Sequence, residues 1–282
     1  MSARWAWDPS LYEGSAPFYA AGRLPYPDEI ALVLGRELGL DGTGRLLDVG
    51  CGPGSLTLVL ADLFDEVVGM DADAGMIEEA RRRAEHLGCG NTRWVLGRAE
   101  SLSPAYGAFR LVTLAQSFHW MERSRVAALL FSLLIPGGAV VHVGATTHRG
   151  STGGTALPGP PPPRDRIDEL VKSYLGPVRR AGRGYLHVGT PSDEDEVFAS
   201  AGFAGPRRRN VGGGQLFARS EDQVVASVYS LSSASPHLFA GQLDTFESDL
   251  RALLREVSPT GEFWERSGDV SLSIWEKPSD SA

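Results

Sequence analysis

Short runs of apolar and β-branched residues alternate with helical patterns through the middle of this sequence. This alternation is typical of a parallel sheet covered by helices, and it predicts an α/β fold. The predicted strands are Arg45–Gly50, Val67–Asp71, Arg93–Gly97, Phe109–Ala115 and Ala139–Gly144, and the predicted helices between them are Ser55–Phe64, Asp73–Leu87 and Glu122–Leu134.

The second half of the chain follows a different pattern. Residues 144–163 are rich in Gly, Pro and Thr, which predicts a loop or linker because few regular elements tolerate that composition. Apolar residues from Leu243 to Val257 recur at three- and four-residue spacing, which predicts an amphipathic helix. Further helices are predicted at Arg164–Tyr174, Ser192–Ala201 and from Ser220, and strands at Arg207–Phe217 and, antiparallel, at Asp269–Trp275.

These elements predict a doubly wound, Rossmann-like sheet of about seven mostly parallel strands with a helical cap insert. We expect an entry or lid segment over residues 1–40, the core over 41–218, the insert over 219–268 and the final core strand with the tail over 269–282. In such sheets the ligand crevice opens at the carboxyl ends of the strands. The loop 145–163 and the insert are therefore expected to roof the pocket, and the Ser-rich segment 230–239 is expected to touch the substrate.

Composition and charge narrow the function classes. The 27 Lys and Arg residues against 35 Asp and Glu residues give a net charge of -8, which disfavours a nucleic-acid surface. The longest apolar run has roughly half of the ~20 residues that a membrane span needs, and the first residues do not resemble a signal peptide, so we expect a cytoplasmic protein. Two arginine runs, 81–83 and 207–209, are expected to be solvated, with recognition of an anionic substrate as the alternative for the second.

The two cysteines, Cys51 and Cys89, cannot form a disulfide framework and match no metal-ligand spacing, so we expect reduced thiols and no metal.

A glycine-rich turn after the first predicted strand is the most informative motif. Residues 46–54 read LLDVGCGPG, and glycines at 50, 52 and 54 allow a sharp turn and a close approach to a nucleotide-like cofactor. The spacing differs from the dinucleotide fingerprint, and Pro53 removes an N–H that a pyrophosphate would need. Asp48 would repel phosphates but suits an ammonium group and a nearby sulfonium. The motif therefore favours S-adenosylmethionine.

The segment Asp48–Gly54 resembles motif I of class I S-adenosylmethionine-dependent methyltransferases, and the resemblance covers roughly residues 46–144. Asp71 matches the acidic residue that closes the second strand in that family, where it accepts hydrogen bonds from both ribose hydroxyls. Met76 resembles the apolar residue against adenine, and residues 97–100 resemble the adenine-edge segment. The predicted cofactor residues are Tyr19, Arg23, Asp48, Gly50, Cys51, Gly52, Gly54, Asp71, Ala72, Met76, Ala99, Glu100, Ala115 and Gln116.

Two further segments resemble the methyltransferase type 11 group, in particular small-molecule enzymes related to trans-aconitate methyltransferase. These are Ala115–Trp120, after the fourth strand, and Tyr19–Pro27, which resembles the entry segment of that group. The resemblance implies a small-molecule acceptor, and the net charge and the short apolar runs predict no nucleic-acid or membrane partner. The predicted substrate residues are Tyr12, Phe18, Tyr26, Ser117, His119 and Trp120.

His119 is the candidate catalytic residue, because a neutral imidazole after the fourth strand could take a proton from a hydroxyl or amine nucleophile. The alternative is that it positions the substrate or braces the loop, since methyl transfer often needs alignment more than a base. For the whole chain, the alternatives are a protein that binds the cofactor without methyl transfer and a macromolecule methyltransferase. The sequence opposes the latter, because it has neither an Asn-Pro-Pro-Tyr motif nor a basic stripe.

Overall fold

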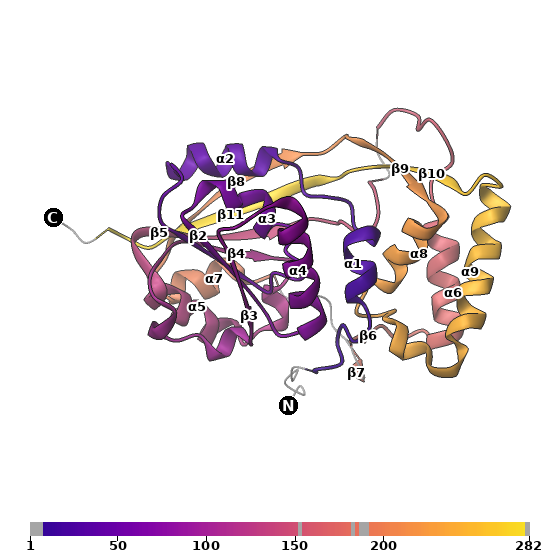
Figure 1. Cartoon of the computed structure of the whole chain (residues 1–282), viewed down its shortest axis with the longest axis horizontal. Helices are drawn as coiled ribbons and strands as arrows, with labels where there is room; N and C mark the ends of the chain where they lie inside the picture. Colours follow the sequence, from indigo (N-terminus) through magenta and orange to yellow (C-terminus); the bar gives the residue numbers. More distant parts are fainter. Residues whose placement is uncertain (1–7, 152–153, 182–183, 186–191, 280–282) are drawn as a thin grey trace. The chain divides into compact units, whose positions relative to one another are not determined.

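The computed structural model describes residues 8–151, 154–181, 184–185 and 192–279, and the chain divides into two compact units (Figure 1). We call the first the helical unit; it comprises Met1–Pro25, Thr146–Gly189 and Gly213–Gly268. The second, the sheet unit, comprises Tyr26–Ala145, Thr190–Gly212 and Asp269–Ala282. Residues 1–7, on which the expectation of no signal peptide rests, lie outside the described residues.

The sheet unit is built on a seven-stranded sheet with the strand order β3-β2-β1-β4-β5-β11-β8. Neighbouring strands from β3 to β5 pair in parallel, whereas β11 pairs antiparallel with both β5 and β8. The predicted mostly parallel, seven-stranded sheet is therefore confirmed. Its strands are β1 (Arg45–Val49), β2 (Glu66–Asp71), β3 (Thr92–Leu96), β4 (Phe109–Ala115), β5 (Leu134–Gly144), β8 (Ala204–Gly212) and β11 (Asp269–Glu276).

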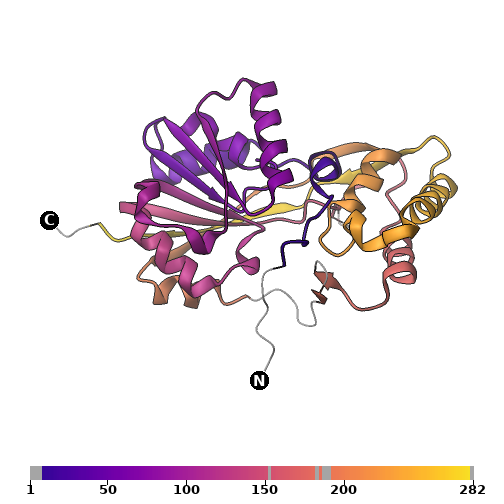
Figure 2. The same cartoon turned by 60° about the horizontal axis from the view of Figure 1, so that its bottom comes forward.

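Helices cover both faces of this sheet (Figure 2). Successive strand residues point to opposite faces, so Leu46 packs in one apolar layer and Leu47 in the other. The first layer includes helices α2 and α3, and the second includes α5 and α7. The helix bounds are α2 (Glu29–Leu38), α3 (Thr57–Leu60), α4 (Ala74–Leu87, against β2 and β3), α5 (Arg123–Leu133) and α7 (Glu194–Ser200).

The helical unit has an apolar core of its own. The predicted amphipathic helix is confirmed as α9 (Leu243–Val257), whose Phe246, Leu250 and Leu254 are fully buried. The helix predicted from Ser220 is also present, and Ser220 forms a capping box with Gln223, with both reciprocal hydrogen bonds. The other elements are α1 (Ala16–Gly22), α6 (Arg164–Leu175), α8 (Glu221–Tyr229), an antiparallel pair of β9 (Leu216–Ser220) and β10 (Glu262–Arg266), and a short pair of β6 (Arg180–Ala181) and β7 (Gly184–Tyr185).

The prediction of one strand over Arg207–Phe217 is wrong. Two strands occupy this region, β8 in the large sheet and β9 paired with β10. Gly212 ends β8, Gly213 and Gly214 follow it before β9, and all three have positive φ (68°, 85° and 76°). A run of left-handed residues cannot continue an extended strand, so the chain leaves one sheet and enters the other.

The compact units also divide the chain differently from the predicted segments. The predicted entry segment 1–40 is split at Pro25, because α2 buries Ile30 and Leu34 against the sheet. The sequence analysis places residues 146–189 in the core segment 41–218, whereas in the structure they belong to the helical unit. The loop predicted over residues 144–163 has no helix between β5 and α6 in its described part, and residues 152–153 lie outside that part. No helix within the described ranges is long and apolar enough to cross a membrane.

Candidate active site

The glycine loop after β1 has two sides with different surroundings. Gly50 and Gly52 both have positive φ, 71° and 53°. A Cβ added at Gly50 would lie 2.4 Å from the Cβ of Ser117, so this glycine is required by packing against the segment after β4. A Cβ added at Gly52 would meet no atom within 4 Å. The backbone at Gly52 is therefore open to the approach of a ligand.

Asp71, at the end of β2, is fixed next to this open position. Its Oδ2 accepts a hydrogen bond from the Gly52 N–H at 2.8 Å, and its Oδ1 accepts one from the Asp73 N–H at 2.9 Å. Burial raises the pKa of Asp71 to about 6, although the two backbone N–H groups oppose that rise. Each carboxylate oxygen keeps acceptor capacity for one more donor, which is what a ribose diol requires.

Asp48 in β1 has no exposed surface and is directed into the protein. Its two oxygens accept hydrogen bonds from Thr57 Oγ1 at 2.5 Å and from Thr113 Oγ1 at 2.7 Å. Burial raises its pKa despite these hydrogen bonds. Asp48 thus joins β1 to α3 and β4 beneath the glycine loop, and its proximity to a sulfonium stays a prediction.

The segment after β4 is joined by Ser117 to the residue that precedes the glycine loop. Gln116 has a φ of 56°, a left-handed conformation that costs a residue with a side chain about 1–3 kcal/mol. Ser117 Oγ donates a hydrogen bond to the Val49 carbonyl at 2.6 Å. His119 and Trp120 follow in a short 3-10 turn, both half-buried, with ring centroids 4.6 Å apart. The predicted acceptor-side residues of this segment therefore lie at the same end of the sheet as the glycine loop.

The predicted adenine-side residues lie on the neighbouring segments. Met76 is buried in the first turn of α4, where its N–H donates to the N-cap Asp73 at 2.9 Å. Glu100, after β3, accepts a hydrogen bond from the Glu122 N–H at 2.9 Å and pairs with Arg98 at 3.1 Å. Each oxygen of Glu100 thus has one partner and keeps acceptor capacity, and its contact with an adenine amine stays a prediction.

The sequence analysis missed Arg83, which it placed on the solvated face of α4. Its Nη1 donates to the Pro53 carbonyl at 2.7 Å and to Ser55 Oγ at 3.2 Å, so it braces the glycine loop. Burial lowers its pKa. The sequence signal that could have identified Arg83 is its spacing of seven residues from Met76, which places both residues on one face of the helix. The run 207–209 is paired with carboxylates: Arg207 with Glu276, Arg208 with Asp195 and Arg209 with Glu37.

The remaining predicted residues do not all belong to the sheet unit. Tyr26 packs on the core of the sheet unit, whereas four others belong to the helical unit. Among these, the Phe18 ring lies 5.0 Å from that of Tyr229. The residues of the helical unit are Tyr12, Phe18, Tyr19 and Arg23. The sheet unit contains the other predicted residues not yet described: Cys51, Gly54, Ala72, Ala99 and Ala115. Of these, Cys51 is buried. Among the described residues, no group of three His, Cys, Asp or Glu side chains could hold a metal ion.

Residues 46–138 match the model of a methyltransferase domain family. The chain is 32% identical over 109 residues to the methyltransferase YcgJ of Bacillus subtilis, a match that covers 36% of this chain and 43% of YcgJ. It is 43% identical over 65 residues to a 23S rRNA (uracil(1939)-C(5))-methyltransferase of Xylella fastidiosa, covering 22% of this chain and 15% of that enzyme. These matches therefore span less than half of each relative.

Solved structures show the same fold. The crystal structure of YcgJ from Bacillus subtilis aligns with a TM-score of 0.51 at 16% identity, over 90% of this chain and all of that one. The crystal structure of the [4+2]-cyclase SpnF aligns with a TM-score of 0.52 at 18% identity, over 96% of each chain. At these identities the likeness shows the fold alone. The matched domain family at residues 46–138 and this fold together support a methyltransferase domain, and a family and fold of this kind imply S-adenosylmethionine as the methyl donor.

Proposed function

We propose that this chain transfers a methyl group from S-adenosylmethionine to an O, N or C nucleophile of a small-molecule acceptor. The observation that carries the proposal is the open space at Gly52 beside Asp71, whose carboxylate is fixed by two backbone N–H groups and retains capacity for a diol. The bound donor would supply an electrophilic methyl group. This chain's residues would supply orientation: Asp71 would hold the ribose, and the glycine loop would allow close approach.

His119 is the residue proposed to act on the acceptor. It follows β4 at the end of the sheet that carries the glycine loop, and a neutral imidazole there can accept a proton from the acceptor's nucleophile. If it is a base, His119→Ala lowers kcat by roughly 10- to 1,000-fold, abolishes an acidic limb in the pH profile and leaves cofactor affinity unchanged. A variant that keeps kcat and raises KM would instead make His119 a positioning residue.

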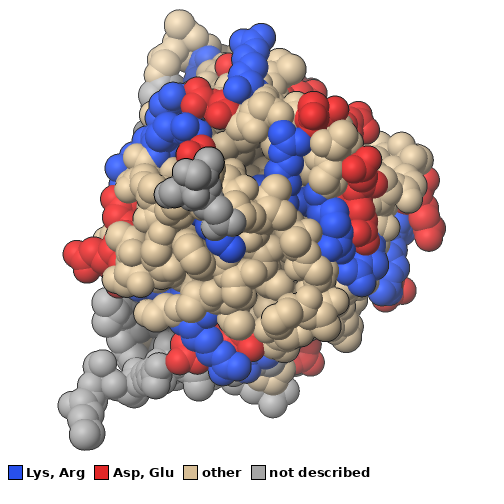
Figure 3. Space-filling model, turned by 90° about the vertical axis from the view of Figure 1, so that its left-hand side faces the viewer, with Lys and Arg blue, Asp and Glu red and all other residues tan. Residues whose placement is uncertain are grey.

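The charge pattern favours a small acceptor over RNA. The chain has a net charge of -8, and on the face in Figure 3 the Lys and Arg side chains lie among Asp and Glu side chains. Ion pairs such as Arg207 with Glu276 use basic side chains that a phosphate backbone would otherwise contact. A nucleic-acid methyltransferase usually presents a basic surface. The rRNA methyltransferase among the relatives makes RNA the competing acceptor in the test.

The test uses methyl-deuterated S-adenosylmethionine with the purified chain and a metabolite extract of the source organism. We expect mass spectrometry to find one labelled small molecule, absent with Asp71→Asn. Label in added RNA instead would overturn the small-molecule acceptor. Binding of the cofactor by calorimetry with no label in any fraction would favour the alternative of binding without transfer. Binding of NAD in place of S-adenosylmethionine would overturn the cofactor assignment.

A further inference from the structure

The helical unit contains a cavity whose lining the glycine-loop site does not include. Its volume is about 390 Å³, within the range of about 300–1,000 Å³ typical of small-molecule sites. Side chains of α6 and α8 and the segment after α8 line it, and Ile167, Val171 and Leu231 give it an apolar wall. The predicted substrate-contacting segment 230–239 contributes Leu231, Ser233 and Ala234. The cavity is thus large enough and apolar enough for the body of a small organic molecule.

The polar part of the wall is cationic. Of the described lining residues, Asp168 is the one carboxylate, against five basic side chains: Arg149, Arg164, Lys172, Arg179 and Arg180. Within the described part of the chain, Arg149, Lys172 and Arg179 have no carboxylate at ion-pairing distance. This concentration of positive charge stands in a chain whose net charge is -8. Like charges gathered around one cavity repel each other unless a ligand brings the opposite sign.

The pKa of His148, in the same wall, is lowered in part by this positive charge. Burial lowers its pKa to about 3, and the positive charges of four arginines add to that effect: Arg23, Arg149, Arg164 and Arg179. The imidazole is therefore neutral at pH 7. It adds no charge to the wall, but its ring nitrogens provide hydrogen-bonding capacity there.

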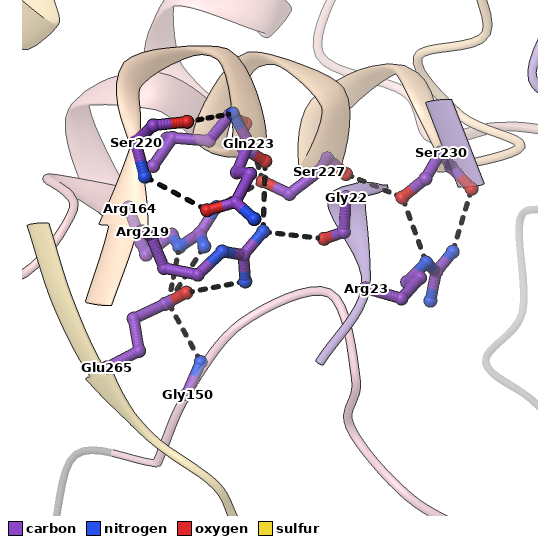
Figure 4. A network of polar contacts seen from close by, with 11 residues as sticks. Gly22, Arg23, Gly150, Arg164, Arg219, Ser220, Gln223, Ser227, Ser230 and Glu265 are labelled. Carbon is purple, nitrogen blue, oxygen red and sulfur yellow. Dashed lines mark hydrogen bonds and ion pairs between the residues drawn. The ribbon is translucent and has the colours of Figure 1, made fainter. Parts of the chain in front are cut away.

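A buried polar network fixes one side of the cationic wall (Figure 4). Glu265 Oε1 accepts from Arg164 at 2.7 Å and from the Gly150 N–H at 2.9 Å, and its Oε2 pairs with Arg219 at 3.2 Å. Arg164 also donates to Ser227 Oγ at 2.8 Å. One carboxylate thus serves two arginines, which leaves this network with an excess positive charge. Arg164 is held in place by these bonds and needs no reorganisation to meet an anion.

Arg23 is a further cation of the helical unit, and it donates hydrogen bonds to uncharged groups. It donates to the Ser230 carbonyl at 2.7 Å and to Ser230 Oγ at 2.8 Å, and it lies 4.5 Å over the Tyr19 ring. These partners orient the guanidinium but do not cancel its charge. Its charge contributes to the potential at His148.

We propose that this cavity binds an oxyanion, a carboxylate or phosphate, carried on a small apolar body. The arginines and Lys172 would meet the anionic group, and Ile167, Val171 and Leu231 would pack against the apolar body. Two sources share this chemistry: the acceptor of the proposed methyl transfer, and a separate effector. The site itself does not rest on the proposed function.

The first experiment compares octanoate, octanol and octylamine as probes of the full chain, by ligand-observed NMR and thermal shift. We expect octanoate to bind at least about tenfold more tightly than octanol, because charge-assisted contacts to fixed cations favour the anion, and octylamine to bind more weakly than either. We also expect octanoate affinity to fall as ionic strength rises. Equal affinity for octanoate and octanol would overturn the proposal.

The variant Lys172→Gln/Arg179→Gln removes two exposed cations that have no carboxylate partner among the described residues. We expect an unchanged or higher Tm without ligand and an octanoate affinity at least about tenfold lower, as expected from losing charge-assisted contacts. The matched control is Arg166→Gln on the same helix, because Arg166 pairs with Glu256 at the surface and does not line the cavity. Equal losses of affinity in both variants would overturn the assignment to this cavity.

The labelled extract assay then distinguishes the two sources of the anion. If the double variant loses the labelled product while Arg166→Gln keeps it, the ligand is the acceptor. If both keep it, the ligand is a separate effector. The probe measurements test the proposed binding site without an enzymatic reaction. A failure of that binding site therefore gives a different result from a failure of the proposed methyl transfer.

Discussion

The glycine-loop site of the sheet unit and the cavity of the helical unit are electrostatic opposites. At the glycine loop the buried ionisable groups are carboxylates, and burial raises the pKa values of Asp48 and Asp71. At the cavity the groups are cations, and the pKa of His148 is lowered. In each region groups of one sign predominate: carboxylates beside the glycine loop, which Arg83 braces, and cations around the cavity. The proposed ligands follow this difference, because Asp71 is assigned to the ribose hydroxyls of the cofactor and the cavity to an oxyanion.

The two regions also differ in how they are assembled. The glycine loop and Asp71 follow two adjacent strands within 22 residues of sequence, from Gly50 to Asp71. The cavity joins residues from His148 to Ala234, and the network on its wall extends to Glu265. A local motif can be recognised in a sequence, whereas a wall built from distant segments depends on tertiary packing. The following predictions test the charge contrast in order of expected effect.

Removing the carboxylate that balances the cationic wall should have the largest effect. Glu265→Gln leaves Arg164 and Arg219 buried without their counterion, so we expect the free energy of unfolding to fall by about 3–5 kcal/mol. Urea denaturation measures it. The control Glu256→Gln removes an exposed partner of Arg166 and should cost less than about 1 kcal/mol. If the free energy of unfolding fell by a similar amount in both variants, the buried ion pairs of Glu265 would contribute no more than an exposed pair.

On the acidic side, Asp71→Asn should weaken binding of S-adenosylhomocysteine by about 1.5–3 kcal/mol, the usual contribution of hydrogen bonds to a charged group. Titration calorimetry measures the affinity, and the exposed Glu78→Gln on α4 is the control. Wild-type affinity in the Asn variant would remove Asp71 from the cofactor site.

The protonation state of Asp71 should also make cofactor binding depend on pH. Its pKa is raised to about 6 in the free protein, and the ionised form is the better acceptor for two hydroxyl groups. Affinity for S-adenosylhomocysteine should therefore fall as pH decreases through about 6, approaching about tenfold per pH unit below it. Calorimetry between about pH 5 and 7 measures the slope, within the range where Asp71 titrates. A slope that persists in Asp71→Asn would assign it to another group.

The smallest effect is expected at Arg83, which contacts the glycine loop through the Pro53 carbonyl and Ser55 Oγ. Arg83→Gln removes these charge-assisted hydrogen bonds, so we expect S-adenosylhomocysteine affinity to fall about two- to tenfold as the loop loosens. The neighbouring Arg82→Gln is the control, because Arg82 pairs with Glu79 on the exposed side of α4. Equal affinities in the two variants would show that the loop does not need this brace.

Local signals in the sequence determined elements in both units. β4 (Phe109–Ala115) of the sheet unit and α9 (Leu243–Val257) of the helical unit have the predicted bounds, because hydrophobic periodicity reflects which face of an element is buried. The glycine spacing and Asp71 indicated the cofactor class, since each depends on a conformation or an acceptor geometry that few residue types provide. The same reasoning failed at residues 207–217, where the consecutive glycines 212–214 with positive φ separate two sheets.

Only the tertiary structure decided the contacts between distant segments. Ser117 reaches the Val49 carbonyl from 68 residues away, and Arg164 reaches Glu265 across 101 residues. Nothing in the local pattern around Arg164 distinguishes a buried network residue from a solvated arginine, because Arg164 is one of three consecutive charged residues at the start of α6. Side-chain periodicity specifies one face of one element. Which other element packs against that face is decided only when elements far apart in the chain come together. The same packing decides the charge and the shape of a cavity.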